Sequence, residues 1–149
     1  MKDVIIIGGG PAGILCAAAI KENAKEMVNV TIVERLEKIG KKILATGNGK
    51  CNFTNKNLSP RRYNNPKFVT PTLSKYGYKE IVEYLESIGL LSKEISEGRM
   101  YPYTESATTV LEVMRMHLNR LGVNVKTNYE VNKVVEKNGR YLVYNKNQR

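Results

Sequence analysis

Three glycines near the amino terminus have the spacing of a phosphate-binding turn. Gly8, Gly10 and Gly13 form a G-x-G-x-x-G pattern after the apolar run at residues 4–7 and before a segment typical of a helix. Gly8 allows a sharp turn, Gly10 lets a pyrophosphate approach the backbone, and Gly13 lets the helix pack closely on the strand. The helix N-terminus would offer free N–H groups and a partial positive charge to the phosphates.

A carboxylate follows where such folds bind a ribose. Residues 30–33 read as a second apolar strand, and Glu34 ends it about 20 residues beyond the last glycine. We expect Glu34 to accept hydrogen bonds from an adenosine ribose and to repel a 2′-phosphate, which argues against NADP. The alternative is a βαβ unit whose glycines serve packing only. These residues do not distinguish FAD from NAD, because both contain the same ADP half.

The remaining pattern predicts an α/β fold around this turn. Helices are expected at residues 66–76, 78–88 and 106–121, the last two each followed by a glycine. Residues 123–125 read as a third strand parallel to the first two, and residues 131–136 and 141–145 as a hairpin around Asn138-Gly139. Residues 36–65 show little periodicity and read as a long loop, and residues 99–103 read as extended or turn.

Length and charge limit the classes of protein to which the chain can belong. The chain has 149 residues, about one domain's worth, with two cysteines and a net charge of +10. No signal peptide or membrane-spanning segment is recognised, which predicts a cytoplasmic protein. The basic residues are scattered, which fits a solvated surface, a site for anionic ligands or a nucleic-acid surface. No RNA-binding signature appears, so we do not expect nucleic acid as a partner.

The cysteines and the one histidine offer few other sites. Cys16 is expected to pack inside the first helix, and Cys51 to be a small apolar filler rather than a redox-active thiol. His117 lies beside a helical apolar stripe with no further ligands, so no metal site is expected.

A second block is more specific than the first. Residues 40–55 read G-K-K-I-L-A-T-G-N-G-K-C-N-F-T-N, which is not a P-loop because glycine is missing at Leu44 and Ser or Thr at Cys51. Its glycines, lysines and asparagines suit an anionic, planar ligand, although a flexible basic loop is the alternative. Together with G-R-M-Y-P at residues 98–102, this block resembles the amino-terminal part of the YhiN/BaiN-like flavoproteins.

That resemblance implies a Rossmann-like FAD-binding fold with a parallel sheet, flanking helices and the start of an antiparallel β-meander. It places the FAD pyrophosphate along the first turn, the ribose at Glu34, the flavin along the second block and the adenine at the Val131 backbone. The implied cofactor-binding residues are Gly8, Gly10, Pro11, Ala12, Gly13, Glu34, Arg35, Lys42, Gly47, Gly49, Lys50, Cys51, Asn52 and Val131. Lys50 and Cys51 are the candidates for a role in the redox reaction, with Lys50 stabilising the anion of the reduced flavin.

Members of that family are much longer than this chain. We therefore expect residues 1–149 to be the amino-terminal portion of an FAD-binding domain, without the substrate domain and the carboxy-terminal segment that closes over the flavin. Alone, the chain is expected to bind FAD weakly or not at all. NAD(P)H is a candidate electron donor, and the missing portion, as a separate chain, a candidate partner. The alternatives are a non-catalytic remnant and a basic nucleic-acid-binding module.

Overall fold

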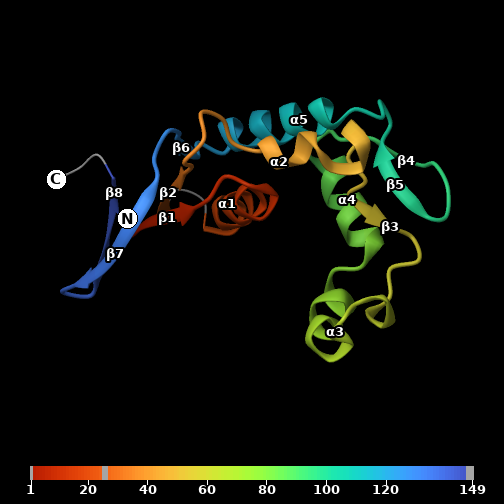
Figure 1. The fold of residues 1–149 in the computed structure, drawn as a ribbon, viewed down its shortest axis with the longest axis horizontal. Coiled ribbons are helices and arrows are strands. Elements are labelled where there is room, and N and C mark those ends of the chain that lie inside the picture. Colours follow the sequence, from red (N-terminus) through yellow and green to blue (C-terminus); the bar gives the residue numbers. More distant parts are fainter. Residues whose placement is uncertain (1, 25–26, 147–149) are drawn as a thin grey trace. The chain divides into compact units, whose positions relative to one another are not determined.

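The computed structural model describes residues 2–24 and 27–146, and these divide into two compact units. Unit 1 comprises residues 1–42 and 115–149, and unit 2 comprises residues 43–114. Helices α2 (Lys41–Leu44) and α5 (Ala107–Arg120) each cross the division (Figure 1).

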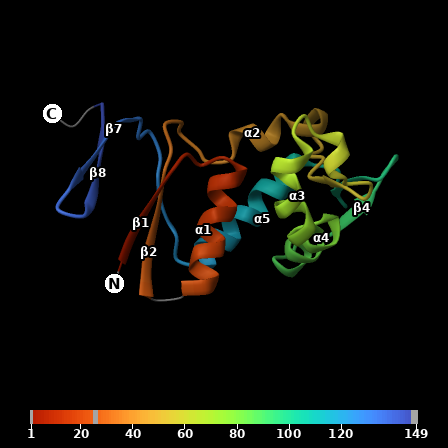
Figure 2. The ribbon, with the colours of Figure 1, turned by 90° about the horizontal axis from the view of Figure 1, so that it is seen from below.

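Unit 1 is built on a three-stranded parallel sheet in the order β1-β2-β6. β1 (Lys2–Ile7) pairs in parallel with β2 (Val28–Val33) through the register Lys2↔Val28 to Ile7↔Val33. β6 (Asn124–Lys126) pairs in parallel with the far side of β2, which confirms the predicted third strand. The first crossover contains α1 (Pro11–Ala24), which lies beside β1 and β2 in both views (Figures 1 and 2).

A hairpin completes the carboxy-terminal part of unit 1. β7 (Val131–Lys137) and β8 (Arg140–Asn145) are antiparallel and join with Lys137 opposite Arg140. Both turn residues are left-handed, with φ of 54° at Asn138 and 72° at Gly139, as a two-residue primed turn requires. The predicted hairpin is confirmed.

The core of unit 1 lies between α1 and β2. Both elements contribute buried side chains to it, and the loop after β2 and the end of α5 contribute one each. The buried residues are Ile14, Ala17, Ala18, Val30, Ile32, Val33, Ile39 and Leu118. Cys16 is exposed, so the expectation that it packs inside α1 is wrong. The helix buries Ile14, Ala17 and Ala18 against the sheet, and position 16 falls outside that stripe.

Unit 2 contains an antiparallel sheet that the sequence did not reveal. β5 (Arg99–Pro102) lies between β3 (Thr54–Asn55) and β4 (Ser92–Glu94), so the segment expected to be extended is its central strand. The region read as a long loop also contains two 3-10 turns, η2 (Thr46–Gly49) and η3 (Pro60–Arg62). The expected helices are present as α3 (Pro66–Lys75), α4 (Tyr78–Ser87) and α5.

Packing in unit 2 joins this sheet to α4 and the first turns of α5. The buried side chains are Ile43, Cys51, Leu85, Ile88, Leu90, Met100, Tyr101, Ala107, Val110, Leu111 and Met114. By contrast, α3 buries none of its residues. Among the described residues, no helix is long and apolar enough to span a membrane.

Candidate functional site

The glycine turn between β1 and α1 has the geometry that its spacing predicts. Gly8 has a φ of 104°, and its N–H donates to the Val33 carbonyl (2.8 Å), which anchors the turn to β2. A Cβ at Gly13 would lie 2.0 Å from the Gly8 carbonyl oxygen, so helix and turn approach each other closely only because Gly13 has no side chain. These two glycines serve the fold.

Gly10 differs from its neighbours because neither a close contact nor a left-handed φ requires glycine there. A Cβ built at Gly10 would have no heavy atom within 4 Å, and its φ is not in the left-handed region. Its carbonyl accepts the first bond of α1, from the Ile14 N–H (3.0 Å), so Gly10 stands at the helix N-terminus. The first N–H groups of a helix have no acceptor within it. Open space therefore faces backbone donors at the positive end of α1, as an anion site requires.

Glu34 is held beside this turn by two backbone donors. One carboxylate oxygen, Oε2, accepts from the Gly9 N–H (2.7 Å), and the other, Oε1, accepts from the Leu36 N–H (2.9 Å). Each carboxylate oxygen can accept a second hydrogen bond. The side chain is half-buried, so it is fixed in orientation and still reachable by a ligand hydroxyl.

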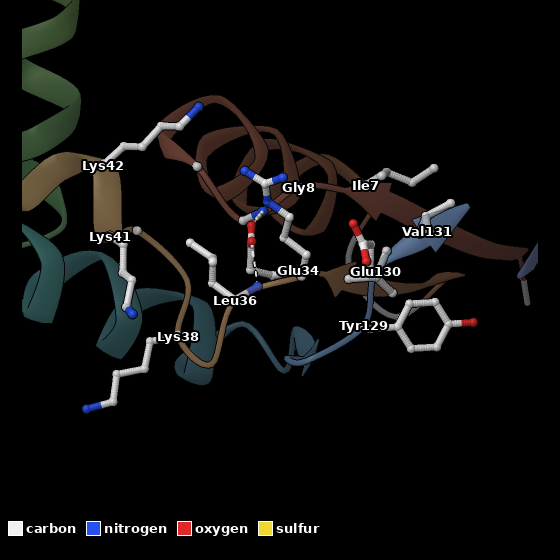
Figure 3. A pocket seen from close by; sticks show the side chains of 15 residues that line it. Ile7, Gly8, Glu34, Leu36, Lys38, Lys41, Lys42, Tyr129, Glu130 and Val131 are labelled. Carbon is white, nitrogen blue, oxygen red and sulfur yellow. Dashed lines mark hydrogen bonds between the residues drawn. The ribbon is translucent and has the colours of Figure 1, made fainter. Parts of the chain in front are cut away.

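A cavity of about 380 Å³ opens at this end of the sheet. Figure 3 shows Glu34 between the lysines of the following loop and of the start of α2 on one side and Tyr129, Glu130 and Val131 on the other. The lining residues are Ile7, Gly8, Gly9, Gly10, Val33, Glu34, Arg35, Leu36, Lys38, Gly40, Lys41, Lys42, Tyr129, Glu130 and Val131. Four cationic side chains against two carboxylates give the lining a net positive charge, which favours an anionic ligand.

The structure thus brings six of the predicted site residues into one cavity: Gly8, Gly10, Glu34, Arg35, Lys42 and Val131. Pro11, Ala12 and Gly13 do not line it and form the first turn of α1. The sequence-based reading missed Tyr129 and Glu130. Their position follows from a backbone ladder, in which the Glu34 N–H donates to Lys126 and the Tyr129 N–H donates to Glu34, at 2.9 and 2.8 Å. No local pattern indicates that pairing.

The remaining predicted residues, Gly47, Gly49, Lys50, Cys51 and Asn52, belong to unit 2. Gly47, Asn48, Gly49 and Cys51 all have positive φ, which makes this a tightly wound segment. The N–H of Lys50 donates to Gly47 and that of Cys51 to Thr46, at 3.1 and 3.0 Å. Cys51 is 6% exposed, as expected for an apolar filler.

The Lys50 ammonium is paired within unit 2. Its Nζ lies 2.7 Å from Glu105 Oε2, and Lys93 Nζ lies 2.9 Å from the other oxygen, Oε1. Hydrogen bonds from both lysines lower the pKa of Glu105 to about 2, and the bond to Glu105 raises the pKa of Lys50. The ion pair holds the Lys50 ammonium in place, and the cluster of two lysines and one carboxylate carries one net positive charge at neutral pH.

His117 contacts a carboxylate. Its Nε2 lies 2.7 Å from a carboxylate oxygen of Glu22, within unit 1. In the part of the chain that the structure describes, no three His, Cys, Asp or Glu side chains are grouped so that they could hold a metal ion.

Comparison with known proteins identifies the family. Residues 2–149 match the model described as the HI0933-like protein Rossmann domain, so the chain belongs to this family and the resemblance seen in the sequence is confirmed. It is 41% identical over 133 residues to a 3-dehydro-bile acid delta(4,6)-reductase of Clostridium scindens, covering 88% of this chain and 32% of that protein. It is 33% identical over 135 residues to a ribosomal RNA dihydrouridine synthase of Haemophilus influenzae, covering 89% of this chain and 33% of that protein.

Solved structures agree on the fold. A flavocytochrome c3 fumarate reductase superposes with a TM-score of 0.64 at 19% identity, over 91% of this chain and 28% of the other. The Rossmann-like fold with a parallel sheet and flanking helices is confirmed. The chain spans about a third of the length of the curated relatives it matches.

Proposed function

We propose that this chain supplies the ADP-binding part of an FAD-binding domain in a flavin-dependent oxidoreductase. The observation that carries the proposal is the cavity at the end of β1 and β2. There Gly10, the N-terminus of α1 and Glu34 lie together. The named activities of the two relatives, a reductase and a dihydrouridine synthase, support redox chemistry.

The residues present suit the ADP half of the cofactor. The pyrophosphate would lie over Gly10, where backbone donors and the partial positive charge of α1 meet open space. The ribose hydroxyls would donate to the unused lone pairs of Glu34. The adenine would lie against Ile7 and Val131, and Arg35 and Lys42 would offset phosphate charge. A 2′-phosphate beside Glu34 would be repelled.

Flavin, when bound, supplies the electron-transfer chemistry, while the protein contributes position and electrostatics. We propose that Lys50 supplies a positive charge near the flavin, because the cluster of Lys50, Lys93 and Glu105 carries one net positive charge. Cys51 is a weaker candidate because it is buried. The proposal includes both residues, and NAD(P)H as the electron donor. It also includes a cytoplasmic location, because the two cysteines are free and are not joined in a disulfide.

Nucleotide titrations followed by amide NMR test the ADP site, since this method detects even millimolar binding. ADP should shift the amides of Gly8, Gly9, Gly10, Ala12, Gly13, Glu34 and Val131, and FAD should shift the same set. The 2′,5′-bisphosphate of adenosine should bind more weakly than ADP. Equal or tighter binding of the 2′-phosphorylated nucleotide, or shifts confined to other residues, would contradict the assignment.

A second proposal concerns the substrate and departs from the expectation that nucleic acid is not a partner, because the distribution of charge favours RNA. Ten Lys and Arg residues and no Asp or Glu lie between Glu37 and Glu80, so this segment accounts for the whole net charge of +10. The basic residues are indeed scattered along the chain, but the acidic ones are not. Of the relatives named above, one acts on ribosomal RNA by its name. A steroid acid, the substrate class in the other name, gains little from so many exposed cations.

The structure adds exposed aromatic rings to this charge. Phe68 is 79% exposed, Tyr76 is 52% exposed, and Tyr63 is also exposed. We call this part of unit 2 the basic helix surface: Arg61, Arg62, Tyr63, Lys67, Phe68, Lys75 and Tyr76. No ion pair joins its four cations to a carboxylate among the described residues. Cations between exposed rings suit single-stranded RNA, because bases stack on rings while phosphates pair with cations.

The test compares two double variants in a salt titration with a uridine-rich single-stranded RNA. Arg61→Ala with Arg62→Ala should weaken binding and lower the salt slope by roughly 1 to 2. The control, Lys133→Ala with Lys137→Ala, removes the same charge from exposed positions of β7 and should weaken binding less. Equal effects of the two variants would refute the RNA surface. So would a chain that binds a 3-oxo bile acid but not RNA.

A further inference from the structure

Unit 1 contains a second cavity, of about 410 Å³, which the proposed nucleotide site does not use. The loop after β2, the last turns of α5 and the segment around β6 form its walls. Lys38 lines both cavities, and the other residues named below as lining the second cavity do not line the first. A cavity of this volume is in the range that binds small organic molecules.

The buried side chain of Ile39 lies between the two cavities. Ile39 lines the second cavity, and its Cγ2 is so close to the glycine turn that a Cβ built at Gly9 would lie 2.4 Å from it. The next residue is also fixed, since the Gly40 N–H donates to the Gly9 carbonyl (2.7 Å). A ligand in the second cavity would therefore contact the far side of the segment that the nucleotide site faces.

Much of the lining of the second cavity is apolar. Ile39 and Leu118 are buried, and Val123 and Val125 line the cavity from the strand side. Gly122 ends α5 with a φ of 67°, and the N–H groups of Gly122 and Val123 both donate to carbonyls of the last turn of α5, at 3.0 Å each. This glycine cap fixes Leu118 and Val123 relative to each other, so the apolar lining is formed without a ligand.

Cationic side chains stand beside the apolar lining. Arg115 Nη2 donates to the Ile39 carbonyl (2.8 Å), which holds the guanidinium at the cavity, and a guanidinium has four further N–H groups. Figure 3 shows the Lys38 side chain directed away from the glycine turn. The carboxylate of the lining, Glu37, is paired with Lys41 (2.9 Å), and this hydrogen bond lowers the pKa of Glu37. The charge that the lining offers to a ligand is therefore positive.

We propose that the second cavity binds a small amphipathic organic anion, with an apolar body and a single anionic group. The apolar body would lie against Leu118, Val123 and Val125, and the anionic group would pair with Lys38 and Arg115. Charge complementarity selects this occupant, because neither a neutral molecule nor a cation would use the two positive side chains. The site is separate from the ADP cavity, so the inference holds whether or not that cavity binds a nucleotide.

Amide NMR titrations with three eight-carbon probes test this charge preference. Octanoate should shift the Val123 and Val125 amides at a lower concentration than octan-1-ol does, and octylammonium should bind most weakly. Lys38→Met keeps an apolar stem and should weaken octanoate binding by about 1.5- to 5-fold, the value of one exposed ion pair, without changing the binding of octan-1-ol. The control, Lys133→Met, should change neither. Equal binding of the three probes, or octanoate shifts confined to other residues, would overturn the proposal.

A matched pair of variants tests the position of the site. Val125→Glu introduces a carboxylate into the cavity, whereas Val134→Glu introduces one on β7, where the side chain has a similar exposure (48% against 41%) and lines neither cavity. Val125→Glu should weaken octanoate binding at least about tenfold through like-charge repulsion, and Val134→Glu should not. A urea melt of each variant checks the fold, and Lys38→Met provides the test if Val125→Glu is unstable. Equal octanoate binding by two folded variants would refute the assignment.

Two other occupants of the cavity give different results. If gel filtration shows that Val125→Glu converts a dimer to a monomer, a second copy of the chain fills the cavity. If a folded chimera, in which this chain replaces the matched third of the Clostridium scindens reductase, no longer binds octanoate, the rest of that protein fills it. Either result would overturn the proposal. A monomeric chain and a folded chimera that still binds octanoate would support it.

Discussion

Replacing Gly10 by alanine should weaken nucleotide binding while leaving the fold intact. The added methyl group meets no protein atom within 4 Å, and the φ of Gly10 is one that alanine adopts. Alanine also restricts the unfolded chain, a gain of about 0.4–1 kcal/mol, but is a poorer residue than glycine at a helix N-cap. These terms nearly cancel, so we expect the free energy of unfolding to change by less than about 1 kcal/mol.

The methyl group would occupy the space that we assign to the pyrophosphate. Moving a phosphate away from the backbone there breaks one hydrogen bond to a charged group, worth about 1.5–3 kcal/mol. That loss raises the Kd for ADP by roughly 10- to 150-fold. The assay is the NMR titration with ADP, combined with a urea melt of each variant.

Gly13→Ala is the contrasting variant. Its Cβ would lie 2.0 Å from the Gly8 carbonyl oxygen, a backbone atom that cannot rotate away. Helix and turn would have to separate by at least about 1 Å, and we expect a loss of at least about 3 kcal/mol of stability. If Gly10→Ala binds ADP as the unchanged chain does, the phosphate does not lie over Gly10. If it unfolds the chain as Gly13→Ala does, the division of roles between the glycines is wrong.

Three further predictions follow from single contacts. Glu34→Gln should weaken the discrimination between ADP and 2′-deoxy-ADP in binding assays, because one of the two carboxylate acceptors is lost. It should also destabilise the chain by about 1–3 kcal/mol, because an amide cannot accept both the Gly9 and Leu36 N–H bonds. The pKa of Glu105 is lowered from 4.5 to about 2, so its contribution to stability is complete above about pH 4.5 and is lost as the pH falls toward 2. In Glu105→Gln, the temperature at the midpoint of unfolding of unit 2 should therefore depend less on pH across that range. Gly139→Ala should destabilise the hairpin by roughly 1–2 kcal/mol, seen as faster amide exchange in β7 and β8, because its φ is 72° and no neighbouring atom compensates.

The parts of the fold that the sequence predicted are those with strong local signals. The first crossover combines an apolar run, a glycine turn and a helix, and the hairpin depends on Asn138 and Gly139 alone for its turn. The sheet of unit 2 gave no such signal. Its strands are two to four residues long, and Thr54 pairs with Met100 across a long sequence separation. Neither periodicity nor turn chemistry records a pairing of that kind.

The residues of the candidate site also differ in whether a local signal in the sequence could predict them. Gly10 and Glu34 could be assigned from spacing and chemistry, because the turn and the end of β2 are adjacent in any βαβ unit. Val131 and the block containing Lys50 were assigned by resemblance, and the structure positions them through bonds between distant residues, such as Tyr129 to Glu34 and Lys50 to Glu105. Spacing arguments are therefore limited to contacts made within one supersecondary unit.

The glycines of the first turn show how folding and function can be separated in such a unit. The left-handed φ of Gly8 and the close contact at Gly13 are both explained by the folded chain itself. Gly10 has neither constraint, although a glycine inside a structured turn weakens the native state by its conformational entropy. Because the N-cap preference for glycine over alanine nearly offsets that cost, the fold neither requires Gly10 nor gains from it, and such a glycine is expected where a ligand approaches. The argument for a nucleotide site therefore depends on Gly10 more than on the two glycines that complete the pattern.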